Sequence, residues 1–475
     1  MHQLKKLHLL LLKVHELVLS IFRILIGIIK LREPSYLFKL TRHISESLEM
    51  FASAMLNSLH GPSHSNDQKF LERNKYWKLA HESYEQGEWE SGNGWLIKAD
   101  LTEDLAAKEN NLNSQNVRII GSNFTESIGH TFAGLSMRAA MKELNESPIR
   151  EYWLLSSDHK TESHLEYWKD YFPILKVTES QRISMEQALW PLVESISTVR
   201  CKEGPVQHRF VHNRYAKLRE EMKFGPLLEV SEEHKVLGYE YLKGFGIREG
   251  DWFAVLHVRE SGDPLYGRNA QIKDYVEAIR FINSLGGYVI RIGDTTMTSM
   301  EKTQGFVDFA LLEKPYSWFD IFLIGECRFY IGTTSGPQFV AYSFGKQMIW
   351  TNAPDVAKAL YFPNSIILPK LVLDQDNRIL SLREMLDSPA GWTDGRIDWI
   401  LDKSGNKKLM TWKSNDPEDI TSAVKEILLM KPSQEPTELQ EKWAREIQRV
   451  NLMPTTKVSN TYAEKWKHHL FNDIN

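Results

Sequence analysis

In the second half of the chain, three apolar runs each stop at small, cationic or hydroxyl residues. The first lies within 251–260 and ends in the sequence His-Val-Arg-Glu; the second covers 287–294. The third, 328–332, continues into the hydroxyl-rich segment 333–337. Helical patterns separate these runs, so the stretch predicts alternating strands and helices around a parallel sheet. Because ligands of such sheets bind at the carboxyl ends of the strands, we expect a site where the runs stop.

A similar alternation precedes this region. Residues 117–120 predict a strand, 121–130 a loop of small residues, 131–144 a helix, and 152–155 the next strand. Together they form one βαβ unit. Helical patterns then continue to about residue 242, interrupted by two Gly-Pro pairs.

The length of the chain, 475 residues, exceeds what one ordinary core accommodates, which favours two domains with extensions. The patterns divide it into an amphipathic helix (1–33), a helical extension (34–115), a first α/β domain (116–242), a second α/β domain (243–430) and C-terminal helices (431–475).

The composition of the chain argues against some classes of function and indicates a cellular compartment. A formal net charge of -4 gives no basic face for nucleic acid. The two cysteines, Cys201 and Cys327, cannot form a disulfide framework in a chain of this size, so we expect a reducing, cytoplasmic setting. In that setting the glycosylation sequons at Asn123 and Asn145 are chance matches.

Residues 4–31 are mostly Leu, Ile, Val and Phe, with polar residues recurring at helical spacing as one narrow, largely basic stripe. No uncharged run reaches the roughly 20 residues of a membrane span. We predict a helix that lies in the headgroup plane and holds the protein on the inner face of the plasma membrane. The alternative is a helix that packs on another part of the protein or on a second copy.

Arg259 is the first candidate for binding chemistry. A guanidinium presents a rigid fork of donors that suits a diphosphate. If a nucleoside diphosphate leaves during group transfer, a fixed cation stabilises its growing charge. His257 lies two residues earlier, on the same side of the strand. It would hold a phosphate or a sugar hydroxyl, or serve the structure alone. The alternative for Arg259 is a surface ion pair with Glu260.

Thr333, Thr334, Ser335 and Gly336 form a predicted strand-to-helix turn, with Pro337 suited to the first helical position. Helix capping needs one hydroxyl, whereas this turn has three beside a glycine. We therefore expect these residues to contact a phosphate or ribose.

Other acidic positions give weaker signals. Gly293 and Asp294 follow the second apolar run, where Asp294 would accept from a ribose or base, or close a turn. Asp320 is expected to cap the helix that leads to Cys327. Asp374-Gln375-Asp376 has the spacing of a metal-binding pair, but its context is typical of a turn. We predict no metal site and no cofactor.

The sequence leaves the general base open. Candidates are carboxylates and a histidine at predicted strand ends and loops: Glu126, His130, Asp158, Glu260 and Asp263. We favour Glu126 with His130, because their loop would face the second domain if the two domains close on each other.

These motifs resemble a bacterial family of glycosyltransferases that is similar to fucosyltransferase-like GT-B enzymes. The resemblance covers about 116–430, and is most specific in the His-Val-Arg-Glu segment, Arg268-Asn269, 287–294, Asp320, 331–336 and Thr351-Asn352. It implies two Rossmann-like domains facing a cleft, metal-independent transfer, and a nucleotide-sugar donor held by the second domain.

By this resemblance, Arg259 matches the arginine of the His-x-Arg motif that binds the donor diphosphate, and Arg268 and Asn269 join the donor site. Fucosyltransferases often carry an acidic residue and a lysine shortly after that arginine. Residues 260–264 contain no lysine, so the resemblance does not extend to GDP-fucose as the donor.

The resulting hypothesis is a membrane-associated glycosyltransferase that moves a sugar from a nucleotide-sugar donor to a surface-polysaccharide or glycolipid acceptor. A lipid-linked acceptor would account for the N-terminal helix. The alternatives are a nucleotide-sugar 2-epimerase and a non-catalytic scaffold that binds sugar or nucleotide. The donor, the acceptor, the linkage and its stereochemistry stay open.

Overall fold

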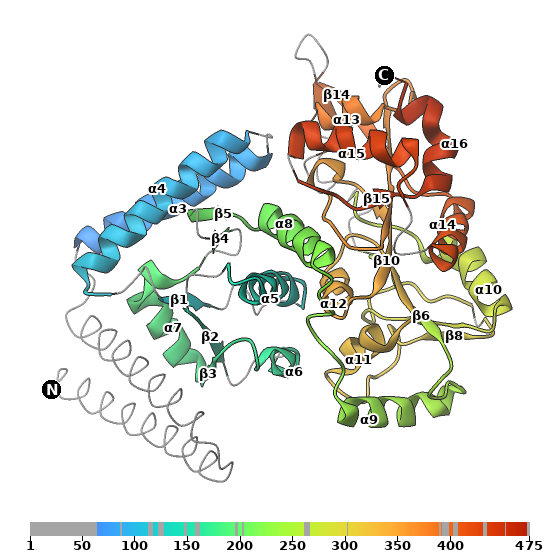
Figure 1. Ribbon diagram of the computed structural model, residues 1–475, viewed down its shortest axis with the longest axis horizontal. Helices are drawn as coiled ribbons and strands as arrows, with labels where there is room; N and C mark the ends of the chain where they lie inside the picture. The colour runs from blue at the N-terminus through green and yellow to red at the C-terminus, as the bar shows by residue number, and fades with distance from the viewer. Residues whose placement is uncertain are drawn as a thin grey trace.

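The computed structural model describes residues 64–475 apart from short segments, namely 86–87, 113–116, 122–127, 147–149, 157–161, 195–197, 202–203, 261–266, 302, 389–390, 392–398, 402–406, 431–434, 452 and 473–475. The predicted amphipathic helix and three of the candidate bases, Glu126, Asp158 and Asp263, lie outside the described residues. Two lobes are visible in Figure 1, each built around a parallel sheet.

The larger lobe contains a seven-stranded sheet in the order β15-β11-β10-β9-β6-β7-β8, with every neighbouring pair parallel. Its strands are β6 (Phe253–His257), β7 (Tyr288–Arg291), β8 (Phe306–Asp308), β9 (Phe329–Gly332), β10 (Gln347–Ala353), β11 (Ile366–Pro369) and β15 (Lys457–Val458). All residues of β6 and β9 are buried. Central strands covered on both faces read as continuous apolar runs, which is why the sequence predicted them.

The strand order contains a reversal. From β6 the chain moves outward to β7 and β8, then returns to β9 on the other side of β6 and continues to β10 and β11. The connection from β6 leads to β7 on one side of the sheet, and the connection from β9 leads to β10 on the other side. The carboxyl ends of β6 and β9 are therefore the topological switch point, where open α/β sheets bind ligands.

Helices and 3₁₀ turns pack around the seven-stranded sheet. They are α10 (Val276–Ser284), α11 (Phe319–Glu326), α12 (Pro337–Ser343), α13 (Leu382–Leu386), α14 (Pro417–Leu429), α15 (Glu438–Asn451) and α16 (Asn460–Leu470), with 3₁₀ turns η4 (Lys243–Phe245), η5 (Ile272–Tyr275) and η6 (Val356–Lys358). A small antiparallel sheet, β12 (Leu371–Asp374), β14 (Lys407–Lys413) and β13 (Trp399–Leu401), lies beside them. Because β15 lies between α15 and α16 and joins the main sheet, the predicted C-terminal helices are part of this lobe.

The smaller lobe has a three-stranded parallel sheet, β1 (Val117–Ile120), β2 (Arg150–Ser156) and β3 (Ile174–Val177), and a hairpin of β4 (Thr198–Cys201) and β5 (Gly204–Gln207). Its helices are α5 (Ile128–Glu143), α6 (Glu162–Leu165), α7 (Glu179–Ala188) and α8 (His208–Glu221), with η2 (Glu166–Trp168) and η3 (Trp190–Leu192). The predicted βαβ unit is confirmed. The prediction of helical structure alone as far as residue 242 was wrong, because β3, β4 and β5 are four-residue strands, too short to show a period.

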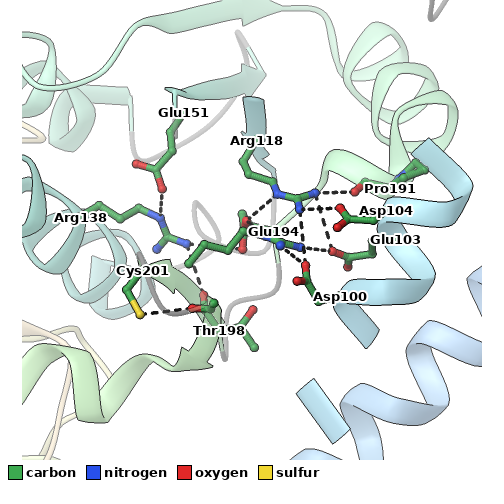
Figure 2. Close-up of polar contacts among 12 residues, drawn as sticks. Asp100, Glu103, Asp104, Arg118, Arg138, Glu151, Pro191, Glu194, Thr198 and Cys201 are labelled. Atoms are coloured by element: carbon green, nitrogen blue, oxygen red, sulfur yellow. Dashed lines mark hydrogen bonds and ion pairs between the residues drawn. The ribbon is translucent and has the colours of Figure 1, made fainter. Parts of the chain in front are cut away.

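Helices α3 (His64–Glu85) and α4 (Trp89–Glu109) form a hairpin on the outer edge of this lobe (Figure 1). A buried ion-pair network joins the hairpin to the lobe (Figure 2). It unites Arg73, Arg118, Arg138 and Arg200 with Asp100, Glu103, Asp104, Glu151 and Glu194. The segment predicted as a helical extension is thus docked on the smaller lobe.

The two lobes also pack against each other. At the first turns of α5 and α12, a Cβ built on Gly336 would lie 2.5 Å from Cα of Gly129. The Asn213 side chain of α8 donates to the Ala359 carbonyl at 3.0 Å and accepts from the Tyr361 amide at 2.8 Å. Helix α9 (Glu232–Leu242), which the sequence places in the first domain, packs on α11 of the larger lobe.

Candidate functional site at the sheet reversal

The carboxyl ends of β6 and β9 bring the two halves of the predicted site together. His257 and Gly332 are register partners on these strands. The Thr333 amide donates to the His257 carbonyl at 3.1 Å, and the Arg259 amide donates to Thr333 Oγ1 at 2.9 Å. Arg259 and the hydroxyl turn therefore lie side by side at the switch point, although 74 residues separate Arg259 from Thr333.

The hydroxyl turn, residues 333–336, is held in place by hydrogen bonds to neighbouring strands. Thr333, Thr334 and Ser335 are all buried. Thr334 Oγ1 accepts a hydrogen bond from Trp350 Nε1 at 2.9 Å, and Thr333 Oγ1 accepts from the Arg259 amide. None of the three hydroxyls caps α12, whose cap position is Gly336 without a side-chain hydrogen bond. The capping alternative is therefore wrong, and the threonine hydroxyls instead hold the turn to β6 and β10.

Arg268 and Asn269 follow the loop after β6. Arg268 donates to the Thr334 carbonyl from both Nε and Nη2, at 3.1 and 2.8 Å. The Asn269 carbonyl accepts from Lys370 Nζ at 2.6 Å. Lys370 is a residue that the sequence reasoning missed: it follows β11, is 4% exposed, and its pKa is lowered to about 8 by burial. The signal was available, since Lys370 also directly follows an apolar run.

Glu260 does not form the surface ion pair with Arg259 that was the alternative for that residue. Its carboxylate accepts from Arg291 Nη2 at 2.9 Å, from the Thr298 amide at 2.8 Å and from the Ile272 amide at 3.3 Å. Arg291 is fully buried and also donates to Asp308 Oδ2 at 3.1 Å. Glu260 thus joins the loops after β6 and β7, a role that occupies the carboxylate proposed as a base.

His257 is buried, with 7% of its surface exposed. Burial lowers its pKa to about 4, and the charges of Arg259 and Arg291 act in the same direction. The imidazole is therefore neutral at physiological pH. Its Nδ1 has no hydrogen-bond partner among the described residues, which leaves one polar atom for a ligand.

Gly293 and Asp294 close the end of β7. Gly293 has a φ of +155°, and its carbonyl accepts from Lys314 Nζ at 2.9 Å. Asp294 Oδ1 accepts from the Thr296 amide at 2.9 Å; hydrogen bonds from Thr296 lower the pKa of Asp294. Asp294 thus closes a turn, one of its two predicted roles.

Two further predictions on acidic residues have different outcomes. Asp320 does not cap α11, since the cap residue is Trp318; Asp320 lies in the first turn and pairs with Lys314. The turn at Asp374 is confirmed: its Oδ1 accepts from the amides of Asp376 and Arg378, each at 3.0 Å. Among the described residues, no group of three or more His, Cys, Asp or Glu side chains is arranged to hold a metal ion.

Thr351 and Asn352, at the end of β10, serve the structure. The Tyr275 hydroxyl lies 2.6 Å from Thr351 Oγ1. Asn352 and Asn415 exchange hydrogen bonds between side chain and main chain, at 2.6 and 2.9 Å. These contacts fix the start of α14 to the sheet, which explains the polar pair without a ligand.

His130 approaches the same region from the smaller lobe. It lies in the first turn of α5 and is exposed. The neighbouring Gly129 contacts Gly336, three residues after Thr333. The first turn of α5 therefore abuts the hydroxyl turn, as expected if the two domains face each other.

Comparisons with known proteins give distant structural likeness only. No family model and no curated protein matches the sequence. A glycosyl transferase family 9 protein from Veillonella parvula has 13% identity and a TM-score of 0.43, over 67% of this chain and 98% of that one. The ADP-heptose lipopolysaccharide heptosyltransferase II of E. coli has 11% identity and a TM-score of 0.36, over 66% and 98%. An iron-containing dodecameric glycosyltransferase from enterotoxigenic E. coli has 12% identity and a TM-score of 0.33, over 77% and 78%.

These scores are too low to assign an activity to this chain. Within its described part, every helix is too short or too polar to cross a bilayer.

Proposed function

We propose that this protein is a glycosyltransferase of the GT-B type that moves a sugar from a nucleotide-sugar donor to a surface-polysaccharide or glycolipid acceptor. The observation that carries the proposal is the adjacency of Arg259 and the 333–336 turn at the β6/β9 switch point. Ligands of open α/β sheets bind at this position of the fold.

Arg259 is the proposed ligand of the donor diphosphate. Its main chain is fixed by Thr333 Oγ1, so the guanidinium starts from a rigid strand end. As the bond from the sugar C1 to the phosphate oxygen breaks, the electron pair stays on the diphosphate, and the cation stabilises that charge. No metal ion takes part in this proposal.

His257 is the proposed neutral partner of the donor. Its buried ring carries no charge at neutral pH and has Nδ1 without a protein partner in the described structure. A neutral imidazole suits a sugar hydroxyl or a phosphate oxygen that needs a directed hydrogen bond in place of a second cation.

The acceptor is proposed to bind on the side of the smaller lobe. His130, with Glu126 in the preceding loop, is the proposed base that takes the proton of the acceptor hydroxyl as its oxygen bonds to C1. The contact of Gly129 with Gly336 supports this assignment, because it places the start of α5 beside the donor-site turn.

We propose that the protein is cytoplasmic and binds peripherally to the membrane, where it would meet a lipid-linked acceptor. The support is the basic amphipathic pattern of residues 4–31. This part of the proposal is separate from the chemistry at Arg259.

The test is a panel of nucleotide sugars assayed for transfer and hydrolysis with wild-type protein and Arg259→Ala. Loss of one donor-site cation is expected to lower turnover about 100- to 1,000-fold. Arg280→Ala, an exposed arginine on α10, is the matched control and is expected to keep full activity.

Each alternative gives a different result. A fully active Arg259→Ala enzyme would remove its assigned role. Conversion of a donor without any acceptor would identify an epimerase. Nucleotide-sugar binding without turnover of any donor would identify a scaffold.

A further inference from the structure

Lys370 lies at the same edge of the large sheet as Arg259. It is the first residue after β11, and two strands, β10 and β9, lie between β11 and β6. Its Nζ nevertheless reaches the loop after β6, where it donates to the Asn269 carbonyl at 2.6 Å. The same peptide unit donates through the Ala270 amide to the Arg259 carbonyl at 3.0 Å. One peptide unit therefore separates the Lys370 ammonium from the main chain of Arg259.

The Lys370 ammonium has more hydrogen-bond donors than the described protein uses. An ammonium carries three N–H donors and no acceptor. In the part of the chain that the structure describes, the Asn269 carbonyl accepts from one of them. The residue is 4% exposed, so bulk water has little access to the other two. Because buried polar groups are normally hydrogen-bonded, these two donors suit a ligand at the sheet edge.

The positive charge of Lys370 is weakly compensated. Within the described residues no ion pair joins it to a carboxylate, and Asp274 in η5 is the acid whose charge acts on it. Burial raises the pKa of Asp274 itself; the charge of Lys273 lowers that pKa and the charge of Asp416 raises it. A buried cation without a carboxylate destabilises the protein, and an anionic ligand at the same edge offsets that cost.

The loop after β6 also carries two arginines to this place. Arg268, directly before Asn269, donates to the Thr334 carbonyl in the hydroxyl turn, and Arg259 follows β6 by two residues. The neighbouring carboxylate, Glu260, is paired with Arg291. Arg259, Arg268 and Lys370 are therefore three positive groups that one loop joins at the carboxyl edge of the sheet.

We propose that Lys370 is a further donor-binding residue, whose ammonium donates to a phosphate oxygen of the nucleotide-sugar while it holds the Asn269 carbonyl. This inference rests on the proposed function, because it assigns another contact to the same diphosphate. A lysine suits both tasks, since its three donors surround one compact charge. The alternative is that Lys370 only holds the loop after β6 in place.

The test measures binding of ADP, GDP and UDP in turn to the full-length protein by isothermal titration calorimetry, at about pH 7 and about pH 9. Burial lowers the pKa of Lys370 to about 8, so the side chain is mostly charged at the lower pH and mostly neutral at the higher pH. A bound diphosphate draws a proton onto the amine. Wild-type protein is therefore expected to take up close to one proton per ligand at about pH 9, and to bind about tenfold more weakly than at about pH 7. Buffers of different ionisation enthalpy measure the uptake.

Variants separate the charge of Lys370 from its contact with the loop. Lys370→Gln keeps a donor for the Asn269 carbonyl but removes the charge. It is expected to weaken binding at about pH 7 by about 10- to 100-fold and to abolish proton uptake at about pH 9. Lys370→Arg keeps its charge at both pH values and is expected to bind equally well at both. Lys425→Gln, at an exposed lysine of α14, is the matched control and is expected to behave as wild type.

Each other outcome contradicts the inference in a recognisable way. Wild-type binding without proton uptake at about pH 9 would show that Lys370 only holds the loop, and the proposed function would stand. The same conclusion follows if Lys370→Gln retains the uptake of wild type. Absence of binding of all three diphosphates to wild-type protein would contradict the donor site itself. If Lys370→Gln does not fold, the uptake of wild-type protein alone decides.

Discussion

Arginine side chains have different surroundings in the two lobes. In the smaller lobe, Arg118 faces Asp100, Glu103, Asp104 and Glu194, all within 4 Å. The larger lobe has Arg259, Arg268 and Arg291 at the carboxyl edge of its sheet. Arg268 donates to a carbonyl, and the carboxylate next to Arg259 in sequence is committed to Arg291.

The comparison distinguishes arginines that stabilise the fold from arginines that are proposed to bind a ligand. An arginine surrounded by buried carboxylates is neutralised, and its energetic role is to avoid an uncompensated charge in the interior. Arg259 is anchored through its main chain at the carboxyl end of the sheet, where its charge acts on the strand ends. Substitutions in the two regions test this distinction.

Arg118→Ala is expected to lower the free energy of unfolding by about 3–5 kcal/mol, because several buried carboxylates lose their main counter-charge. Arg118 is 1% exposed, so water cannot replace it easily. Urea denaturation followed by circular dichroism measures the change. Lys108→Ala, at an exposed lysine of α4, is the control and should stay within about 0.5 kcal/mol. A loss near zero for Arg118→Ala would mean that the network does not hold the hairpin.

Arg268→Ala is expected to cost about 1–2 kcal/mol of unfolding free energy, since it removes two hydrogen bonds to the Thr334 carbonyl. The same denaturation experiment compares it directly with Arg118→Ala. If the two losses are equal, the sheet-edge arginines are as structural as those of the network, and the distinction fails.

The two regions are also expected to respond to pH in opposite directions. Burial raises the pKa of Glu103 from 4.5 to about 8, so between these values the folded protein keeps a proton that the unfolded chain releases. Stability in the smaller lobe therefore falls as pH rises through this window. The pKa of His257 falls from 6.5 to about 4, so the unfolded chain binds the extra proton. Its contribution is lost as pH falls through that range.

Denaturation at several pH values measures both slopes. Relative to wild type, Glu103→Gln should gain stability as pH rises from about 5 to about 8. His257→Gln should gain as pH falls below about 6.5. Parallel pH profiles for both variants and wild type would show that neither group carries the expected linkage.

The sequence predicted the larger sheet well because its central strands are buried on both faces. Each of β6, β7, β9 and β10 contains at least three consecutive apolar residues, and each strand lies where expected. The short strands β3, β4 and β5 were missed, since their four residues include Lys176, Arg200 or the Gly204-Pro205 pair and so form no continuous apolar run.

The site was only partly predictable. That Arg259 and Thr333 lie at strand ends follows from the apolar pattern, but their contact depends on strand order, which no local pattern encodes. The role of Glu260 depends on Arg291, a partner 31 residues away. The ion-pair network joins residues from 73 to 200 and was not visible as a motif for the same reason.

One hydrophobic cluster runs through both lobes without a break, from Phe132 and Trp168 in one to Val255 and Phe322 in the other. Cutting the polypeptide near residue 242 would therefore split a continuous interior and leave each fragment with a bare oily surface. We therefore expect that neither half folds on its own, so the mechanism is best dissected by point substitution in the intact chain.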